Sequence, residues 1–132
     1  VAAIDCGTNS IRLLIADITN GNFKEVVREM EIVRLGQGVD QNKSFHPDAI
    51  ARTLSAVEKF SAQISSKGVE KVRFCATSAT RDATNRNIFT DGVKKILGVE
   101  LRILEIFKTT IFIENYNSFN FRVGCVIFLF NN

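Results

Sequence analysis

Two different periods of apolar positions divide the first hundred residues of the chain. Three short apolar runs come first, each bounded by small or polar residues, which is typical of β-strands. Two stretches with apolar residues at helical spacing follow, and each leads into a further short apolar run. The pattern therefore predicts strands at Ala2–Asp5, Ile11–Ile18 and Phe23–Leu35, a helix that begins at Pro47 and ends at Gly68, a strand at Val69–Thr77, a helix at Arg86–Leu97 and a strand at Leu101–Leu104.

The connecting segments carry residues that begin or end these elements. Asn20-Gly21-Asn22 is typical of a hairpin turn, and residues 36–46 are predicted to form a polar loop. Pro47 suits the first turn of a helix, whereas Gly68 and Gly98 suit the position just past a helix end.

The two predicted helices supply much of the expected core. Burying five apolar side chains of the first helix contributes about 1.5–3 kcal/mol each, or on the order of ten in total before entropy. The positions expected to face inward are Ile50, Leu54, Val57, Phe60 and Ile64 in the first helix and Ile88, Phe89, Val93, Ile96 and Leu97 in the second.

The order of the elements predicts the fold class. Three antiparallel strands, a helix, a strand, a helix and a strand (βββαβαβ) form a mixed sheet in the ribonuclease-H-like order. The expected class is therefore α/β, as a half-domain of that type. With 132 residues the chain has the size of one domain and is long enough to bury a core.

The composition changes after residue 105. Six of the eleven phenylalanines and five asparagines fall in the 27 residues 106–132. One interpretation is a divergent strand-turn-strand, with strands at Thr109–Glu114 and Phe121–Phe130, that extends the sheet. The other is a reading-frame shift after Leu104, which the richness in residues with A/T-rich codons favours. We expect residues 1–105 to form one subdomain, followed by a divergent or frameshifted tail that is not an independent domain.

Charge and cysteine content argue against several function classes. The net charge is +3 and the basic residues are scattered, which disfavours a dedicated nucleic-acid surface but suits a polyanionic substrate. Cys6, Cys75 and Cys125 lack Cys-x-x-Cys spacing, and with the single His46 they make no plausible zinc set. Such thiols suit a reducing cytoplasm, and the opening residues do not form a signal peptide. The longest apolar run, Val126–Phe130, is too short to span a membrane.

The strongest chemical signal is the string Asp-Cys-Gly-Thr-Asn-Ser-Ile-Arg between the first two predicted strands. The Asp5 carboxylate stands at the end of an apolar run. The small and hydroxylated residues of the turn that follows offer hydrogen-bond donors to the oxygens of an anion. Gly7 lets the backbone approach a ligand closely. Since Asp5 repels a bare phosphate, it suggests a bridging Mg²⁺ or a bound water. The alternative is an ordinary polar hairpin, because these are also common turn residues. The candidate phosphate-binding residues are Asp5, Gly7, Thr8, Asn9, Ser10 and Arg12.

Two motifs together carry a resemblance to a known family. Asp-x-Gly-Thr-Asn-Ser-x-Arg-Leu, from Asp5 to Leu13, and Cys-Ala-Thr-Ser-Ala-Thr-Arg-Asp-Ala-Thr-Asn, from Cys75 to Asn85, stand in the expected order and about the expected distance apart. They resemble the first phosphate loop and the Ala-Thr-Ser-Ala-x-Arg-x-Ala-x-Asn segment of the exopolyphosphatase and guanosine pentaphosphate phosphatase (Ppx/GppA) family. That family belongs to the actin-like, sugar-kinase and heat-shock-protein ATPase superfamily. The resemblance covers residues 1–104.

The resemblance implies a cytoplasmic, Mg²⁺-dependent phosphohydrolase. Family members act on inorganic polyphosphate or on guanosine pentaphosphate, and intact members are homodimers with no specific nucleic-acid or membrane partner. By position, Asp5 would help hold the metal or the hydrated phosphate, and Thr77 and Ser78 would bind phosphate. Arg81 would supply a charge-assisted fork, which a guanidinium does better than an ammonium. Arg12 is a weaker candidate, because it could equally form a structural ion pair.

The sequence departs from the family after Leu104. Family members carry a Gly-Glu-Glu-Glu-Ala-like segment there, whose glutamate activates the attacking water, and later a second phosphate loop, Asp-x-Gly-Gly-Gly-Ser. Here Glu105-Ile-Phe-Lys follows, and neither feature occurs in the 132 residues. Because phosphoryl transfer depends on positioning and on charge stabilisation, we expect a truncated, catalytically incomplete chain with no assigned catalytic residue.

Three functions remain open at this point. The chain is a polyphosphate or guanosine pentaphosphate phosphohydrolase domain, a nucleotide-binding half-domain of a kinase or ATPase relative, or a non-catalytic remnant. The segment Ala76–Ala83 speaks against the second of these. Because both motifs follow predicted strands of one sheet, Asp5, Thr8 and Asn9 should lie within reach of Thr77–Arg81, at the carboxyl ends of adjacent strands.

Overall fold

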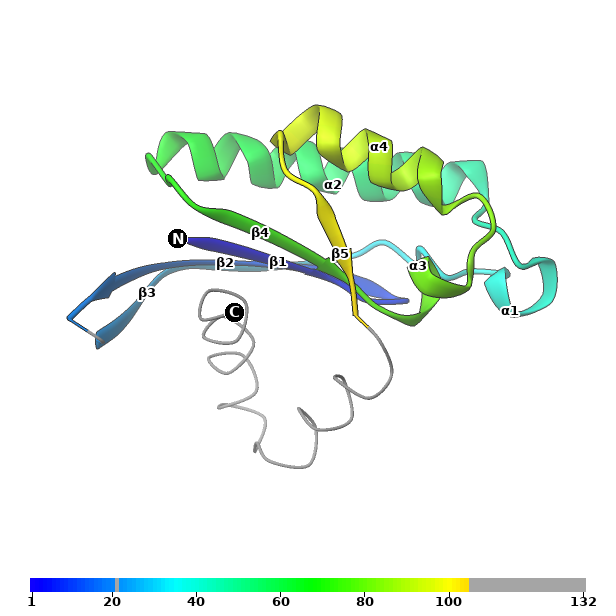
Figure 1. Ribbon diagram of the computed structural model, residues 1–132, viewed down its shortest axis with the longest axis horizontal. Coiled ribbons are helices and arrows are strands. Elements are labelled where there is room, and N and C mark those ends of the chain that lie inside the picture. The colour runs from blue at the N-terminus through cyan, green and yellow to red at the C-terminus, as the bar shows by residue number, and fades with distance from the viewer. Residues whose placement is uncertain (21, 105–132) are drawn as a thin grey trace, which may run out of the picture.

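The described part of the chain is a five-stranded sheet with helices against one face (Figure 1). A computed structural model describes residues 1–20 and 22–104. The two interpretations of the tail and part of the Asn20–Asn22 turn therefore lie outside the described residues. In chain order the elements are β1 (Ala2–Cys6), β2 (Ser10–Thr19), β3 (Asn22–Ile32), α1 (Val39–Asn42), α2 (Pro47–Ser66), β4 (Val72–Ala76), α3 (Ser78–Asp82), α4 (Arg86–Leu97) and β5 (Leu101–Ile103).

The sheet is mixed, as the element order predicts. Its strands lie in the order β3-β2-β1-β4-β5, with β2 antiparallel to both β1 and β3. Strands β1, β4 and β5 run parallel to one another. Because these three strands point the same way, their carboxyl ends meet at one edge of the sheet, and the α/β class is confirmed.

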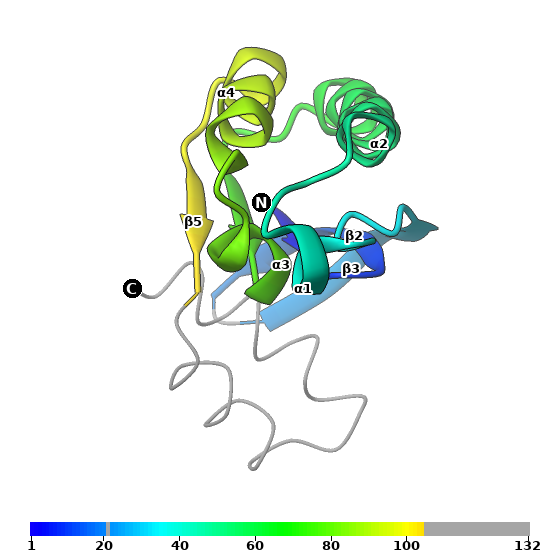
Figure 2. The same ribbon diagram turned by 90° about the vertical axis from the view of Figure 1, so that its right-hand side faces the viewer.

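Helices α2 and α4 lie side by side on one face of the sheet (Figure 2). Pro47 occupies the first turn of α2, and the Asp48 N–H donates to Nδ1 of the capping residue His46 at 3.1 Å, so the helix begins where predicted. Between helices and sheet, the Phe89 ring meets the rings of Phe45 and Phe74 edge-on. These aromatic side chains join α4, the loop before α2 and strand β4 into one core.

The two described cysteines lie on neighbouring strands but face opposite sides of the sheet. Cys6 belongs to the core on the helix side, whereas Cys75 packs with Ala3 and Leu14 on the other side. Both are buried free thiols. Burial raises the pKa of Cys6, and burial together with the Asp5 carboxylate raises the pKa of Cys75 to about 11.

Several predicted details are wrong. Ile88 was expected to face inward but is 55% exposed, whereas its neighbour Phe89 is fully buried. The third strand ends at Ile32 rather than at Leu35, since the chain turns at Arg34, whose φ is 49°. The short helices α1 and α3 were not predicted, because one turn of helix has too few residues to show a period.

Within residues 1–20 and 22–104, no helix is both long and apolar enough to cross a membrane.

Candidate functional site

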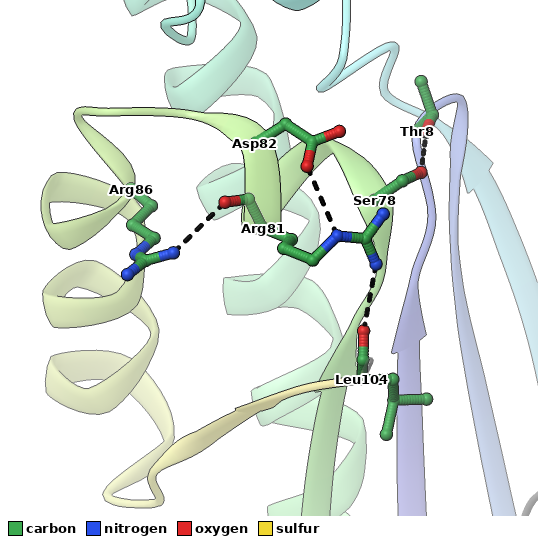
Figure 3. A network of polar contacts seen from close by, with 6 residues as sticks. All are labelled: Thr8, Ser78, Arg81, Asp82, Arg86 and Leu104. Atoms are coloured by element: carbon green, nitrogen blue, oxygen red, sulfur yellow. Dashed lines mark hydrogen bonds and ion pairs between the residues drawn. The ribbon is translucent and has the colours of Figure 1, made fainter. Parts of the chain in front are cut away.

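The two phosphate motifs lie next to each other in the structure. Parallel pairing sets Cys6 opposite Ala76, so that the β1–β2 turn and the β4–α3 connection leave the same edge of the sheet. The N–H of Thr77 donates to the carbonyl of Cys6 at 3.2 Å. The Thr8 and Ser78 hydroxyls are 3.3 Å apart and share a hydrogen bond across the two motifs (Figure 3). Thus residues 70 positions apart in sequence meet at one edge of the sheet.

The carbonyl oxygens of the β1–β2 turn are bonded within the chain. The N–H of Gly7 donates to the carbonyl of Ser10 at 2.9 Å, which closes the turn. The N–H of Gly36, in the segment after β3, donates to the carbonyl of Thr8 at 2.9 Å. These two acceptors, which would repel an anion, are thereby directed to donors of the protein.

Asn9 is held in the same way, by two donors at once. Its carbonyl oxygen accepts from the N–H groups of Val33 and Arg34, each at 2.9 Å. In contrast, the amide N–H groups of Thr8 and Asn9 have no acceptor among the described residues, and both residues are exposed. The carbonyl oxygens of this turn are bonded within the chain, and two of its amide N–H groups have no acceptor among the described residues. Such a turn is suited to binding an anion.

Asp5 and Arg12 form an ion pair on adjacent strands. They are directly opposite each other in the β1–β2 ladder, and Arg12 Nη1 lies 3.8 Å from Asp5 Oδ2. Burial raises the pKa of Asp5, and the Arg12 guanidinium partly opposes that shift. Arg12 Nε is buried without an acceptor in the described part of the chain. The structural ion pair considered for Arg12 is therefore present.

Arg81 is anchored beside the end of β5. Its Nε donates to Asp82 Oδ1 at 3.3 Å and its Nη1 to the carbonyl of Leu104 at 3.2 Å, while Arg86 Nη1 donates to the Arg81 carbonyl at 3.1 Å (Figure 3). Among the described residues, no hydrogen bond joins the Arg81 side chain to the β1–β2 turn. Within the described residues, these bonds use two of the five guanidinium N–H donors of Arg81.

Carboxylates are few at this edge of the sheet. No group of three or more His, Cys, Asp or Glu side chains in the described residues could hold a metal ion. The strands that carry the turn hold two carboxylates. Asp17 lies near the end of β2 remote from the turn, whereas Asp5 is next to the turn and is paired with Arg12. These residues do not form a complete cation site by themselves.

Sequence reasoning missed the segment that follows β3. Residues 33–36 were assigned partly to a strand and partly to a polar loop, yet three of their N–H groups bond the carbonyls of Thr8 and Asn9. No local pattern marks such a role, since it depends on which segment the fold places beside the turn.

Comparison with known proteins agrees with this arrangement. The sequence profile described as the Ppx/GppA phosphatase family matches residues 14–106. Exopolyphosphatase 2 of Mycobacterium tuberculosis is 50% identical over 105 residues, which cover 76% of this chain and 33% of that protein. Guanosine-5'-triphosphate,3'-diphosphate pyrophosphatase of Aliivibrio fischeri is 30% identical over 104 residues, covering 79% of this chain and 21% of that protein.

A solved structure shows the same fold. The Ppx/GppA family member of Aquifex aeolicus superposes with a TM-score of 0.78 at 29% identity, over 84% of this chain and 36% of that one. The predicted actin-like ATPase fold is confirmed by this match. The chain spans about a third or less of the length of these relatives. Because the family profile covers more than half of the sequence, the chain belongs to the Ppx/GppA phosphatase family.

Proposed function

We propose that this chain binds a phosphate chain, either inorganic polyphosphate or the phosphates of guanosine pentaphosphate, at the turn Gly7–Ser10 and the segment Thr77–Arg81. In this proposal the domain is the phosphate-binding part of a phosphohydrolase. The observation that carries it is the turn itself, where the carbonyls of Thr8 and Asn9 are bonded inward while their amides are free among the described residues. The names of the two relatives support both substrate classes.

Each site residue has a role that its chemistry suits. The Thr8 and Asn9 amides and the Ser10 hydroxyl donate to phosphate oxygens. The hydroxyls of Thr77 and Ser78 add donors from the start of α3. Gly7 keeps the approach to the backbone open.

The arginines have different tasks in this proposal. Arg81 offers the guanidinium donors that have no acceptor among the described residues as a charge-assisted fork to a phosphate group. Arg12 acts mainly on Asp5, because its guanidinium lies beside that carboxylate rather than at the turn.

The residues fit a Mg²⁺ that enters together with the phosphate chain. Mg²⁺ in phosphate sites is usually held by one or two carboxylates, waters and phosphate oxygens, and Asp5 provides one such carboxylate. When bound, the metal would neutralise phosphate charge beside Asp5. A resident ion held by the chain alone is not part of the proposal.

We further propose that the 132-residue chain does not hydrolyse its ligand at a useful rate. Asp5 and Asp82, the carboxylates of the two motif segments, are both paired with arginines. The sequence after Leu104 lacks the carboxylate cluster that the family resemblance calls for. General-base assistance typically contributes ~10²–10⁴-fold, so its loss leaves binding without turnover. Purified protein with Mg²⁺ and long-chain polyphosphate should release phosphate no faster than buffer does.

We also propose the boundaries of the domain and its cellular compartment. The family match ends at residue 106, which supports a subdomain at 1–105 followed by a tail that is not an independent domain. The nucleotide sequence after the Leu104 codon tests the frameshift interpretation, since a Glu-Glu-Ala reading frame in another phase would establish it. Buried free thiols at Cys6 and Cys75 support a reducing compartment such as the cytoplasm.

Calorimetric titration with tripolyphosphate at low salt tests the binding proposal. Arg81→Ala should weaken binding roughly ten- to hundredfold, because a charge-assisted partner is worth about 1.5–3 kcal/mol. Lys95→Ala, which removes an exposed charge from α4, should have little effect. Equal losses in both variants would mean nonspecific attraction. Absence of binding would leave a non-catalytic remnant, and tighter binding of ATP than of tripolyphosphate would favour the kinase-like alternative.

A further inference from the structure

Gly36 lies where the two phosphate motifs meet, although it belongs to neither. A Cβ atom added to Gly36 would stand 2.2 Å from Cγ2 of Thr8 and 3.1 Å from Cβ of Ala79. Thr8 lies in the β1–β2 turn, and Ala79 lies in α3. The backbone of residue 36 thus fills the narrow space between the turn and the helix that carries the second motif.

Space, not backbone conformation, is what this position requires. The described glycines with positive φ are Gly38, Gly68 and Gly98, and Gly36 is not among them. Its φ does not call for glycine, so its lack of a side chain matters because Thr8 is so close. The N–H of Gly36 also holds the Thr8 carbonyl at 2.9 Å, so the same residue sets both the distance and the orientation of Thr8.

Backbone strain two residues before Gly36 fits this picture. Arg34 has a left-handed φ of 49°, which is uncommon for a side chain of its kind. The turn at this point lets the N–H groups of Val33 and Arg34 reach the Asn9 carbonyl and returns the chain to Thr8 at Gly36. Residues 33–36 therefore form a backing segment behind the turn.

We infer that Gly36 is a positioning residue for phosphate binding, which sets the separation of the two motifs by allowing Thr8 to pack against its backbone. The expected effect of Gly36 on binding rests on the proposed function. Its effect on structure does not, because Gly36 lies beside the 3.3 Å contact between the Thr8 and Ser78 hydroxyls that joins the two motifs.

The displacement caused by a methyl group follows from the distances. An ordinary contact of a Cβ atom is 3.4 Å or more, so a contact of 2.2 Å has to open by about 1.2 Å. In catalysis, a misplacement of about 1 Å can lower the rate on the order of a hundredfold, and donors that must meet phosphate oxygens depend on position in the same way. Thr8 Cγ2 is the main obstacle, because the other two neighbours, at 3.1 and 3.3 Å, need to move by only a few tenths of an ångström.

The test is a double-mutant cycle with a matched control. Gly36→Ala is introduced into the natural chain and into a Thr8→Ser chain, which keeps the hydroxyl but lacks Cγ2. Gly92→Ala is the control, because its Cβ would also be crowded, 2.7 Å from Leu54 Cδ1, but between α4 and α2. Two quantities are measured in each variant: the amide chemical shifts of residues 8–10 and 78 without ligand, and the affinity for tripolyphosphate.

We expect Gly36→Ala to shift these amides and to weaken binding at least tenfold in the natural chain, and roughly threefold or less in the Thr8→Ser chain. Gly92→Ala should lower the melting temperature without changing the loop shifts or the affinity. Equal effects of Gly36→Ala in both backgrounds, unchanged loop shifts, or an equal loss of affinity in Gly92→Ala would overturn the inference. If the natural chain binds no tripolyphosphate, the proposed function fails, while the shift pattern and its suppression by Thr8→Ser still decide the role of Gly36.

Discussion

Truncating Phe89 to alanine should remove a large part of the stability of this fold. Its side chain is fully buried, and its ring meets Phe45 at a centroid distance of 5.9 Å and Phe74 at 6.2 Å, with interplanar angles of 75° and 69°. A buried Phe→Ala change costs about 3–5 kcal/mol. Each edge-on aromatic pair adds about 0.5–1.5 kcal/mol beyond area burial, so we expect the upper part of that range.

The stability lost in Phe89→Ala can be compared with the total free energy of unfolding. Domains of this size have a free energy of unfolding of about 5–15 kcal/mol, and 1 kcal/mol corresponds to about 4 °C in melting temperature. A loss of about 4 kcal/mol should therefore lower the melting temperature by roughly 15 °C. Urea unfolding followed by circular dichroism measures the loss directly, provided that the slope m is unchanged.

The neighbouring residue is the matched control. Ile88 lies on the same helix but is 55% exposed, so Ile88→Ala should change the free energy of unfolding by about 0.5 kcal/mol or less. The reasoning would be refuted if Phe89→Ala cost less than about 1 kcal/mol, or if Ile88→Ala cost as much as Phe89→Ala.

Three further predictions concern single side chains. Because the pKa of Asp5 is raised above 3.8, the folded state holds that proton more tightly, so the free energy of unfolding should fall as pH rises from 3.8 through the folded pKa. Asp5→Asn should remove this slope, and an unchanged pH profile would contradict it. Cys75, with its pKa raised to about 11, should be alkylated at pH 8.5 roughly a hundredfold more slowly than in urea, as peptide mapping would show; equal rates would contradict its burial. Asn85→Ala should cost about 1–3 kcal/mol, since its amide bonds both the N–H and the carbonyl of Phe45, whereas a similar cost for the exposed Asn87→Ala would argue against that reason.

The sequence predicts the sheet and the long helices because their patterns extend over several periods. Helix α2 begins at Pro47 as expected, and its inward positions Val57, Phe60 and Ile64 are buried. Periodicity could not separate Ile88 from Phe89, because adjacent helical residues point only about 100° apart and both fit an apolar stripe. Which of them faces inward is decided by how α4 packs on the sheet, where the Phe89 ring meets Phe74 of β4.

The site is predictable only in part for a similar reason. The turn Gly7–Ser10 is visible in the sequence, since its donors and small residues are contiguous. Its partner Ser78 follows from the expectation that β1 and β4 are parallel neighbours. The role of Gly36 is different, because its closeness to Thr8 arises from how the chain returns after β3 and leaves no local signal.

Amide chemical shifts recorded during a tripolyphosphate titration test the central claim most directly. The account predicts saturable shifts centred on the amides of Thr8 and Asn9, whose N–H groups have no acceptor among the described residues, with smaller shifts at Ser78 and no response at Lys95. Shifts that centre on α4, or that spread evenly over the basic residues without saturating, would contradict the claim that this turn is a phosphate-binding site.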